Sequence, residues 1–305
     1  MRTRKLGPLE VTVVGLGCNN FGGRIDEDAT RAVVDAALDA GVTFFDTADI
    51  YGNQGGSEEY LGRVLQGRRD QVVLATKFGK PMGDGVERRG TESYIRQALD
   101  ASLQRLQTEV VDLYQHHEED TGTPLEETIG TLDALAAEGK IRAYGTSNYR
   151  PETVVRAKEL AKGPFVSEQS EYSLLRRDVE AELLPTCERL GLGFLPFFPL
   201  ASGLLTGKVS RENPPAEGTR LHGREISDAD LDQVDALRAW ADAHGHSLLE
   251  VAIGALAATK PIASVIAGAT KPDQVRANAA AGAWEPSADE LAEIRNSGIN
   301  FAERN

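Results

Sequence analysis

The sequence predicts an α/β protein folded as a (β/α)8 TIM barrel, preceded by a β-hairpin and interrupted by a long insertion after the seventh strand. Short apolar runs alternate with helical patterns along the chain, and eight such strand–helix units fit within its 305 residues. The apolar runs are continuous, which is typical of parallel strands covered on both faces. Polar side chains follow several of these runs, as expected where parallel strands end at one rim.

The positions of the elements follow from apolar runs and helical spacing. The first helix, for example, has Asp26 as a candidate N-cap, acidic residues in its first turn, and Gly41 as its stop. The expected strands are residues 13–17, 42–46, 72–78, 110–117, 141–146, 165–169, 193–198 and 262–267. Further helices are expected at residues 57–66, 91–106, 125–138, 151–160, 179–190, 247–258 and 271–281.

A doubly wound open sheet is the rival fold. Such a sheet most often carries a glycine-rich dinucleotide fingerprint after its first strand. The matching segment here is Gly15-Leu16-Gly17-Cys18-Asn19-Asn20, in which asparagine stands in place of the third glycine. The barrel is therefore favoured.

Two segments lie outside the repeating units. Residues 4–6 and 11–13, on either side of a Gly-Pro pair, predict a hairpin. Residues 201–243 form a long insertion that ends in an extra helix at 228–243. An insertion at the carboxyl ends of barrel strands is expected to act as a ligand lid, and a disordered surface loop is the alternative. Residues 1–305 are expected to form one domain.

Composition excludes several function classes. The net charge of −14 and the pI near 4.9 argue against a nucleic-acid or anionic-membrane partner. The two cysteines give neither a disulfide framework nor a metal-ligand spacing, so no metal site is expected. No apolar leader or membrane-length run is found, and a cytoplasmic monomer or small homo-oligomer is expected.

Four polar residues are predicted to meet at the carboxyl rim of the barrel. Asp46, Lys77 and His117 end three successive strands, and Tyr51 follows the first of them. A nearby ammonium is expected to lower the pKa of a tyrosine, and an imidazole can orient a substrate oxygen. Together these groups suit proton delivery to a carbonyl oxygen. Taken singly, each also has a structural explanation, such as a buried ion pair or a core histidine.

The motifs around these residues resemble the aldo-keto reductase superfamily across nearly the whole chain. The matching segments are Phe44–Gly52 (FFDTADIYG), Gly56–Gly62 (GSEEYLG), Ala75-Thr76-Lys77 and Asp112–His117 (DLYQHH). The resemblance implies NAD(P)H-dependent reduction of a small aldehyde or ketone. Tyr51 would give the proton, Lys77 and Asp46 would adjust the pKa of Tyr51, and His117 would orient the carbonyl. His116 is expected to face away from the site, because neighbouring strand residues point to opposite faces.

The resemblance also implies a cofactor site, with NADPH favoured over NADH. Lys271 and Arg276 are candidates to bind a 2′-phosphate, and Phe198 stands where many relatives have serine. The implied cofactor-binding residues are Gly17, Cys18, Asn19, Ser147, Asn148, Gln169, Phe197, Leu200, Ser202, Gly203, Leu205, Gly268, Ala269, Thr270, Lys271, Gln274 and Asn278.

Two other functions compete with carbonyl reduction. The first is an NADP(H)-binding redox-sensing or regulatory barrel with little turnover. The second is a lyase or isomerase that uses Lys77 as a Schiff base, which the context of Asp46 and Tyr51 disfavours. Near the rim, Glu118, Glu119 and Asp120 form an acidic edge that is expected to disfavour anionic substrates.

Overall fold

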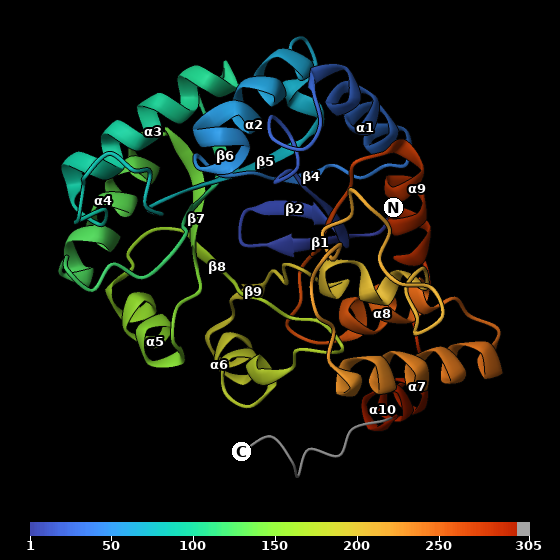
Figure 1. Cartoon of the computed structure of the whole chain (residues 1–305). Helices are drawn as coiled ribbons and strands as arrows, with labels where there is room; N and C mark the ends of the chain where they lie inside the picture. Colours follow the sequence, from blue (N-terminus) through green and yellow to red (C-terminus); the bar gives the residue numbers. More distant parts are fainter. Residues whose placement is uncertain (298–305) are drawn as a thin grey trace.

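Eight parallel strands form a ring in the computed structural model, which describes residues 1–297 (Figure 1). The strands are β3 (Val14–Gly17), β4 (Phe44–Asp46), β5 (Val73–Phe78), β6 (Val111–His116), β7 (Ile141–Ser147), β8 (Phe165–Gln169), β9 (Gly193–Phe194) and β10 (Val265–Gly268). Their order in the sheet is β10-β3-β4-β5-β6-β7-β8-β9. The ring closes where Phe194 forms a parallel bridge with Ile262 and the Ile266 amide donates to the Pro196 carbonyl. The predicted barrel is confirmed.

Helices follow the strands and cover the outside of the ring (Figure 1). They are α1 (Glu27–Asp39), α2 (Tyr51–Val64), α3 (Glu92–Leu106), α4 (Leu125–Ala137), α5 (Pro151–Leu160), α6 (Leu183–Leu190), α8 (Leu248–Ala258) and α9 (Pro272–Ala281). At the start of α1, the Asp26 side chain accepts a hydrogen bond of 2.9 Å from the Ala29 amide. This bond and the acidic first turn explain why the helix begins there.

The predicted hairpin is present and fills the amino-terminal end of the barrel. Strands β1 (Thr3–Leu6) and β2 (Leu9–Thr12) pair antiparallel. The buried side chains of Leu6, Leu9 and Val11 form one apolar cluster with inward-facing strand residues such as Phe44 and Leu113. This end of the ring is therefore closed by side chains.

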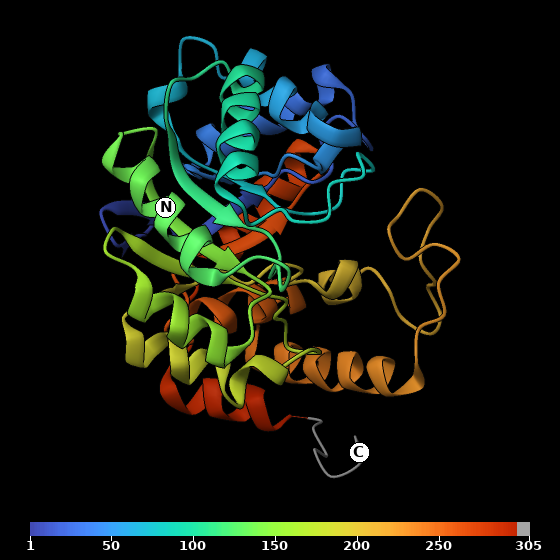
Figure 2. The ribbon, with the colours of Figure 1, turned by 90° about the vertical axis from the view of Figure 1, so that its left-hand side faces the viewer.

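The insertion between β9 and β10 lies at the other end of the barrel, away from the hairpin (Figure 2). It contains a short 3-10 segment at Ala201–Thr206, residues 207–227 without helix or strand, and α7 (Asp228–His244). The extra helix predicted at 228–243 is thus confirmed. Helix α7 packs on α8 and α10 (Ala288–Asn296) in an apolar cluster separate from the barrel core.

Several boundaries differ from the prediction, and one helix was not predicted. Strands β9 and β10 are shorter than the expected runs at 193–198 and 262–267. Helix α2 is assigned from Tyr51, but residues 52–55 have positive φ, so regular helix begins only after them, close to the expected start. Helix α10 was not predicted, although Ser287 and Glu290 form a capping box at its start.

The packing of α2 against α3 predicts a strong effect of Gly62→Ala on stability. A Cβ at Gly62 would lie 2.3 Å from the Arg105 carbonyl oxygen, so the two helices must move apart. We expect a loss of about 1–3 kcal/mol in the free energy of unfolding, measured by urea denaturation.

Gly130→Ala is the matched control, because Gly130 lies within α4 and a Cβ there would meet no atom within 4 Å. Alanine has the better helix propensity, so this change should stabilise the protein by up to about 1 kcal/mol. Equal effects of the two substitutions would contradict the close approach of α2 to α3.

Candidate active site

A buried ion pair lies inside the carboxyl end of the barrel. The Lys77 ammonium donates to Asp46 Oδ2 at 2.5 Å and to the Thr47 carbonyl oxygen at 3.1 Å. The Lys77 side chain is wholly buried, because β5 directs it into the ring beside β4. Burial lowers the pKa of Lys77, but Asp46 and Tyr51 outweigh burial and raise it above its ordinary value. Lys77 is therefore charged at neutral pH.

Two glutamines complete the hydrogen bonding of Asp46. Its Oδ1 accepts from the side-chain amide of Gln115 at 3.1 Å and from that of Gln169 at 3.0 Å. Gln169 was predicted as a cofactor residue, and in this structure it binds Asp46. Gln115 was not predicted, although it lies near the end of β6, two residues before His117, and so faces the same side.

Tyr51 lies beside the ion pair, on the turn that follows β4. Its ring centroid is 5.2 Å from the Lys77 ammonium nitrogen. Burial raises the pKa of Tyr51 above its ordinary value, and the nearby Lys77 only partly opposes that effect. The prediction of a lowered pKa is therefore wrong in its net direction, because the sequence does not report how deeply the phenol is buried. Tyr51 is a neutral phenol at neutral pH.

The two adjacent histidines have different surroundings. His117 lies edge-on to Tyr51, with 5.7 Å between ring centroids. Burial and the charges of Lys77 and Lys80 hold the pKa of His117 well below its usual range, so the ring is neutral. His116 instead stacks on Phe78 and shares a 2.7 Å hydrogen bond with the Tyr149 hydroxyl. As predicted, His117 is the histidine near Tyr51 and His116 faces the outer layer.

The loop after β7 carries the predicted pair Ser147 and Asn148. Asn148 has a positive φ of 59°, and its side-chain amide donates to Ser147 Oγ and to the His117 carbonyl oxygen. Behind this loop, the fully buried Glu168 accepts from Thr146 Oγ1 at 2.5 Å and from the Tyr149 amide at 3.2 Å. Glu168 was not singled out from the sequence, yet it holds the loop from both sides.

The loop between β10 and α9 is tied by the side chain of Gln274. Its Oε1 accepts from the amides of Thr270 and Lys271, at 2.7 and 3.2 Å. The Lys271 amide is thus engaged within the loop, whereas its side chain is exposed and outside any ion pair of the described residues. Asn20 donates to the Ala269 carbonyl oxygen, which places the predicted residues Gly17, Asn19, Gly268, Ala269 and Thr270 around adjacent strand ends.

The remaining predicted residues lie at the start of the insertion or in the core. Phe197, Leu200, Ser202 and Gly203 are half-buried at the carboxyl end of the ring. Phe198, Ala201 and Ser202 have positive φ, a strained arrangement for residues other than glycine that is common at functional sites. The side chains of Cys18 and Leu205 expose no surface, and Asn278 is buried on α9. Arg276 pairs with Asp273.

Within residues 1–297, no group of three or more histidine, cysteine or acidic side chains could hold a metal ion. In that same range, no helix is long and apolar enough to cross a membrane.

Comparison with known proteins identifies the family. Residues 13–299, nearly the whole chain, match the model of the Aldo/keto reductase family. The chain belongs to this family. Aldo/keto reductases are oxidoreductases that act on small carbonyl compounds and generally bind NAD(P)H.

Individual relatives agree with this membership. This aldo/keto reductase is similar to "Probable aldo-keto reductase 1" of Glycine max, with 37% identity over 230 residues that cover 72% of the chain and 66% of the relative. It is also similar to a "Probable voltage-gated potassium channel subunit beta" of Oryza sativa subsp. japonica. The identity is 36% over 275 residues, which cover 85% of this chain and 83% of the relative. The solved holo form of aldo-keto reductase AKR11C1 from Bacillus halodurans matches with a TM-score of 0.84 and 34% identity, covering 99% of this chain and 97% of that one.

The buried Glu168 of this aldo/keto reductase predicts a pH-dependent stability. Burial raises the pKa of Glu168 from 4.5 to about 7, against hydrogen bonds that lower it. A carboxyl with a raised pKa contributes stability below its unfolded pKa and loses it as the pH rises through the folded pKa. Relative to Glu168→Gln, the free energy of unfolding of the wild type should therefore fall by on the order of 3 kcal/mol between pH 4.5 and pH 8.

The measurement is urea denaturation of both proteins across this pH range. Glu109→Gln, at an exposed position, is the control and should follow the wild type at every pH. A constant difference between wild type and Glu168→Gln would refute the raised pKa.

Proposed function

We propose that this aldo/keto reductase reduces an aldehyde or ketone to an alcohol with NADPH. The observation that carries the proposal is the group of four side chains at one end of the ring. A charged Lys77 paired with Asp46 lies beside a neutral Tyr51, and a neutral His117 lies edge-on to the same phenol. These states are the ones that proton transfer to a carbonyl oxygen requires.

Each residue has a distinct proposed role. Tyr51 donates its phenolic proton to the carbonyl oxygen as negative charge develops there, and the resulting phenolate is stabilised by the Lys77 ammonium. Asp46 keeps Lys77 charged and fixed in position. His117, being neutral, donates a hydrogen bond to the carbonyl oxygen and orients it. When bound, NADPH supplies the hydride that the carbonyl carbon receives, so that hydride and proton together complete the alcohol.

The residues around the four side chains fit a nicotinamide dinucleotide. Ser147 and Asn148 present polar groups next to His117 and would hold the carboxamide of the nicotinamide. Ala201 and Ser202 have positive φ at the start of the insertion. Next to them, a Cβ at Gly203 would meet no atom within 4 Å, so the dinucleotide would have room to approach the backbone there. The exposed Lys271 ammonium lies at the edge of the ring, where it would bind a 2′-phosphate.

Tyr51→Phe tests the proposed acid. The substitution removes one hydroxyl, so turnover of an aldehyde with NADPH should fall by about two to four orders of magnitude, the usual contribution of general acid catalysis. The NADPH dissociation constant, measured by fluorescence titration, should stay within about twofold of the wild-type value because Tyr51 makes no proposed contact with the phosphates.

Tyr60→Phe is the matched control for this experiment. Tyr60 lies on the outer helix α2, where it packs against Arg63, and its loss should leave turnover unchanged. Wild-type turnover by the Tyr51 variant would remove Tyr51 from the proposed mechanism.

Lys271→Ala tests the preference for NADPH. Loss of one charged partner of a phosphate should weaken NADPH binding about tenfold, with no effect on NADH, which has no 2′-phosphate. Isothermal titration with both nucleotides measures the difference. Lys162→Ala, at another exposed lysine, should leave both affinities unchanged. Equal losses for NADPH and NADH would show that Lys271 does not bind the 2′-phosphate.

A regulatory role is the second candidate, and one comparison favours it. The rice relative is described as a probable voltage-gated potassium channel subunit beta. In that case the barrel would bind NADP(H) and report its redox state with little turnover. Measured turnover across a panel of aldehydes separates the two functions: tight NADPH binding without consumption of NADPH would favour the regulatory role.

A further inference from the structure

A row of four buried side chains lies behind the candidate active site, on the outer face of the sheet. The strand register aligns Phe78 on β5, His116 on β6, Thr146 on β7 and Glu168 on β8. Each is the chain neighbour of a residue already placed at the carboxyl end of the ring, in the order Lys77, His117, Ser147 and Gln169. Because adjacent residues of a strand point to opposite faces, the row lies directly behind these residues.

His116 is the member of this row that reaches the loop after β7. Its ring stacks on Phe78 with 10° between the ring planes, and its Nδ1 lies 2.7 Å from the Tyr149 hydroxyl oxygen. Burial lowers the pKa of His116 from 6.5 to about 4, so the ring is neutral. Among residues 1–297 the Tyr149 hydroxyl has no other acceptor, so we assign the hydroxyl as the donor and Nδ1 as the acceptor.

Tyr149 is held through both its main chain and its side chain. Its amide donates to the Glu168 carboxylate at 3.2 Å, and its buried ring packs in the core between the sheet and the helices. The preceding residue, Asn148, has a φ of 59°, which is costly for any residue except glycine and persists only where surrounding contacts determine it. The two hydrogen bonds of Tyr149 are such contacts.

Strand β6 is therefore joined to the loop after β7 at two successive residues. The Asn148 side-chain amide donates to the His117 carbonyl oxygen at 3.0 Å. One residue earlier on β6, the His116 imidazole accepts from Tyr149. These two bonds fix the loop relative to the His117 imidazole.

We propose that His116 and Tyr149 are positioning residues for hydride transfer. Neither contacts a reactant, but the hydrogen bond between them holds Ser147 and Asn148 at a fixed distance from His117. In the proposed function, those two residues bind the carboxamide and His117 orients the carbonyl, so the proposal rests on that function. Small displacements of reacting groups lower the rate steeply, and a fixed loop avoids them.

Two substitutions of His116 isolate the contribution of the hydrogen bond. His116→Leu and His116→Asn both lose the stack on Phe78, but the asparagine side-chain oxygen can replace Nδ1 as the acceptor from Tyr149. We expect kcat for an aldehyde to fall about tenfold in His116→Leu and to stay within about threefold of the wild-type value in His116→Asn. Equal falls would show that the lost stack, rather than the hydrogen bond, slows the reaction.

Nucleotide binding provides a measurement that does not depend on turnover. Tyr149→Phe removes the same hydrogen bond and should raise the NADPH dissociation constant about tenfold, measured by isothermal titration. The dissociation constant of 2′-phospho-ADP-ribose, which lacks the nicotinamide, should stay within about twofold of the wild-type value. A purely structural role would weaken the binding of both nucleotides.

Tyr144→Phe is the matched control for this measurement. Tyr144 lies on β7 in the same outer core, and its hydroxyl donates to Asp133 on α4 at 2.5 Å. The substitution removes a comparable hydrogen bond that does not involve the loop. It should leave kcat and both dissociation constants unchanged.

The proposal is overturned if Tyr149→Phe keeps the wild-type kcat and NADPH affinity, or if it weakens both nucleotides equally. It is also overturned if the losses in kcat of His116→Leu and Tyr149→Phe add in the double variant, because two changes that remove one bond should not add. A wild type that reduces no aldehyde would refute the proposed reductase. The comparison of the two nucleotides would then still decide whether the pair positions the loop, and a wild type that binds neither nucleotide would refute both proposals.

Discussion

The ion pair between Lys77 and Asp46 is the interaction on which the arrangement of the site depends. A wholly buried ammonium persists only when its charge is opposed and its protons are accepted. Asp46 and the Thr47 carbonyl oxygen meet that need, and Gln115 and Gln169 satisfy the other oxygen of Asp46. Removing one partner of a buried pair typically costs about 3–5 kcal/mol, so this polar layer constrains folding as well as chemistry.

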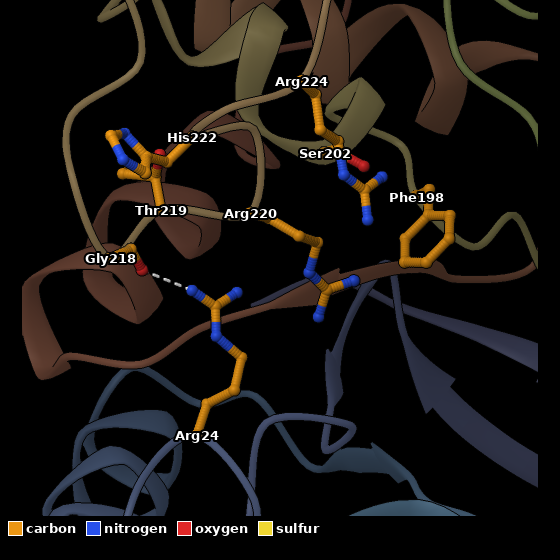
Figure 3. Close-up of a pocket in the computed structure, with 8 residues that line it drawn as sticks. All are labelled: Arg24, Phe198, Ser202, Gly218, Thr219, Arg220, His222 and Arg224. Atoms are coloured by element: carbon orange, nitrogen blue, oxygen red, sulfur yellow. Dashed lines mark hydrogen bonds between the residues drawn. The ribbon is translucent and has the colours of Figure 1, made fainter.

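Local and overall charge have separate consequences in this protein. The net charge of −14 keeps the molecule acidic at long range, but exposed charges are screened beyond about 10 Å at moderate salt. A ligand at the carboxyl end of the ring would therefore respond mainly to nearby charges, which include Arg24, Arg220 and Arg224 around one cavity (Figure 3). Net charge argued against nucleic acid as a partner, yet it could not indicate the sign of the charge in a single pocket.

Much of the fold and the centre of the site could be predicted because both depend on strand ends. Continuous apolar runs indicated parallel strands, and Asp46, Lys77 and His117 each follow such a run. The alternation of strand residues separated His117 from His116. Gln115 obeys the same rule and could have been found by it.

Other features depend on contacts between distant segments, which a single sequence does not display. Glu168 lies on the predicted strand at 165–169, and only the packing of β7 against β8 shows what its carboxylate binds. Arg24 and Arg220 are far apart in the chain, and they line one cavity because the insertion folds back to Arg24, which donates to the Gly218 carbonyl oxygen. The pKa of Tyr51 was misjudged because burial, which outweighs the neighbouring ammonium, is set by the surrounding tertiary structure.

The hairpin at the amino-terminal end of the ring limits how ligands can enter and leave the barrel. Leu6, Leu9 and Val11 seal that end with apolar packing, so the polar layer around Asp46 opens in one direction only. In the proposed reaction, the dinucleotide and the carbonyl substrate must then both enter and leave through the carboxyl end of the ring. A dinucleotide held deeper, against the proposed contacts Ser147 and Asn148, would have to arrive first and depart last. In the proposed reaction, the order of binding would thereby depend on a pair of strands that touches neither reactant.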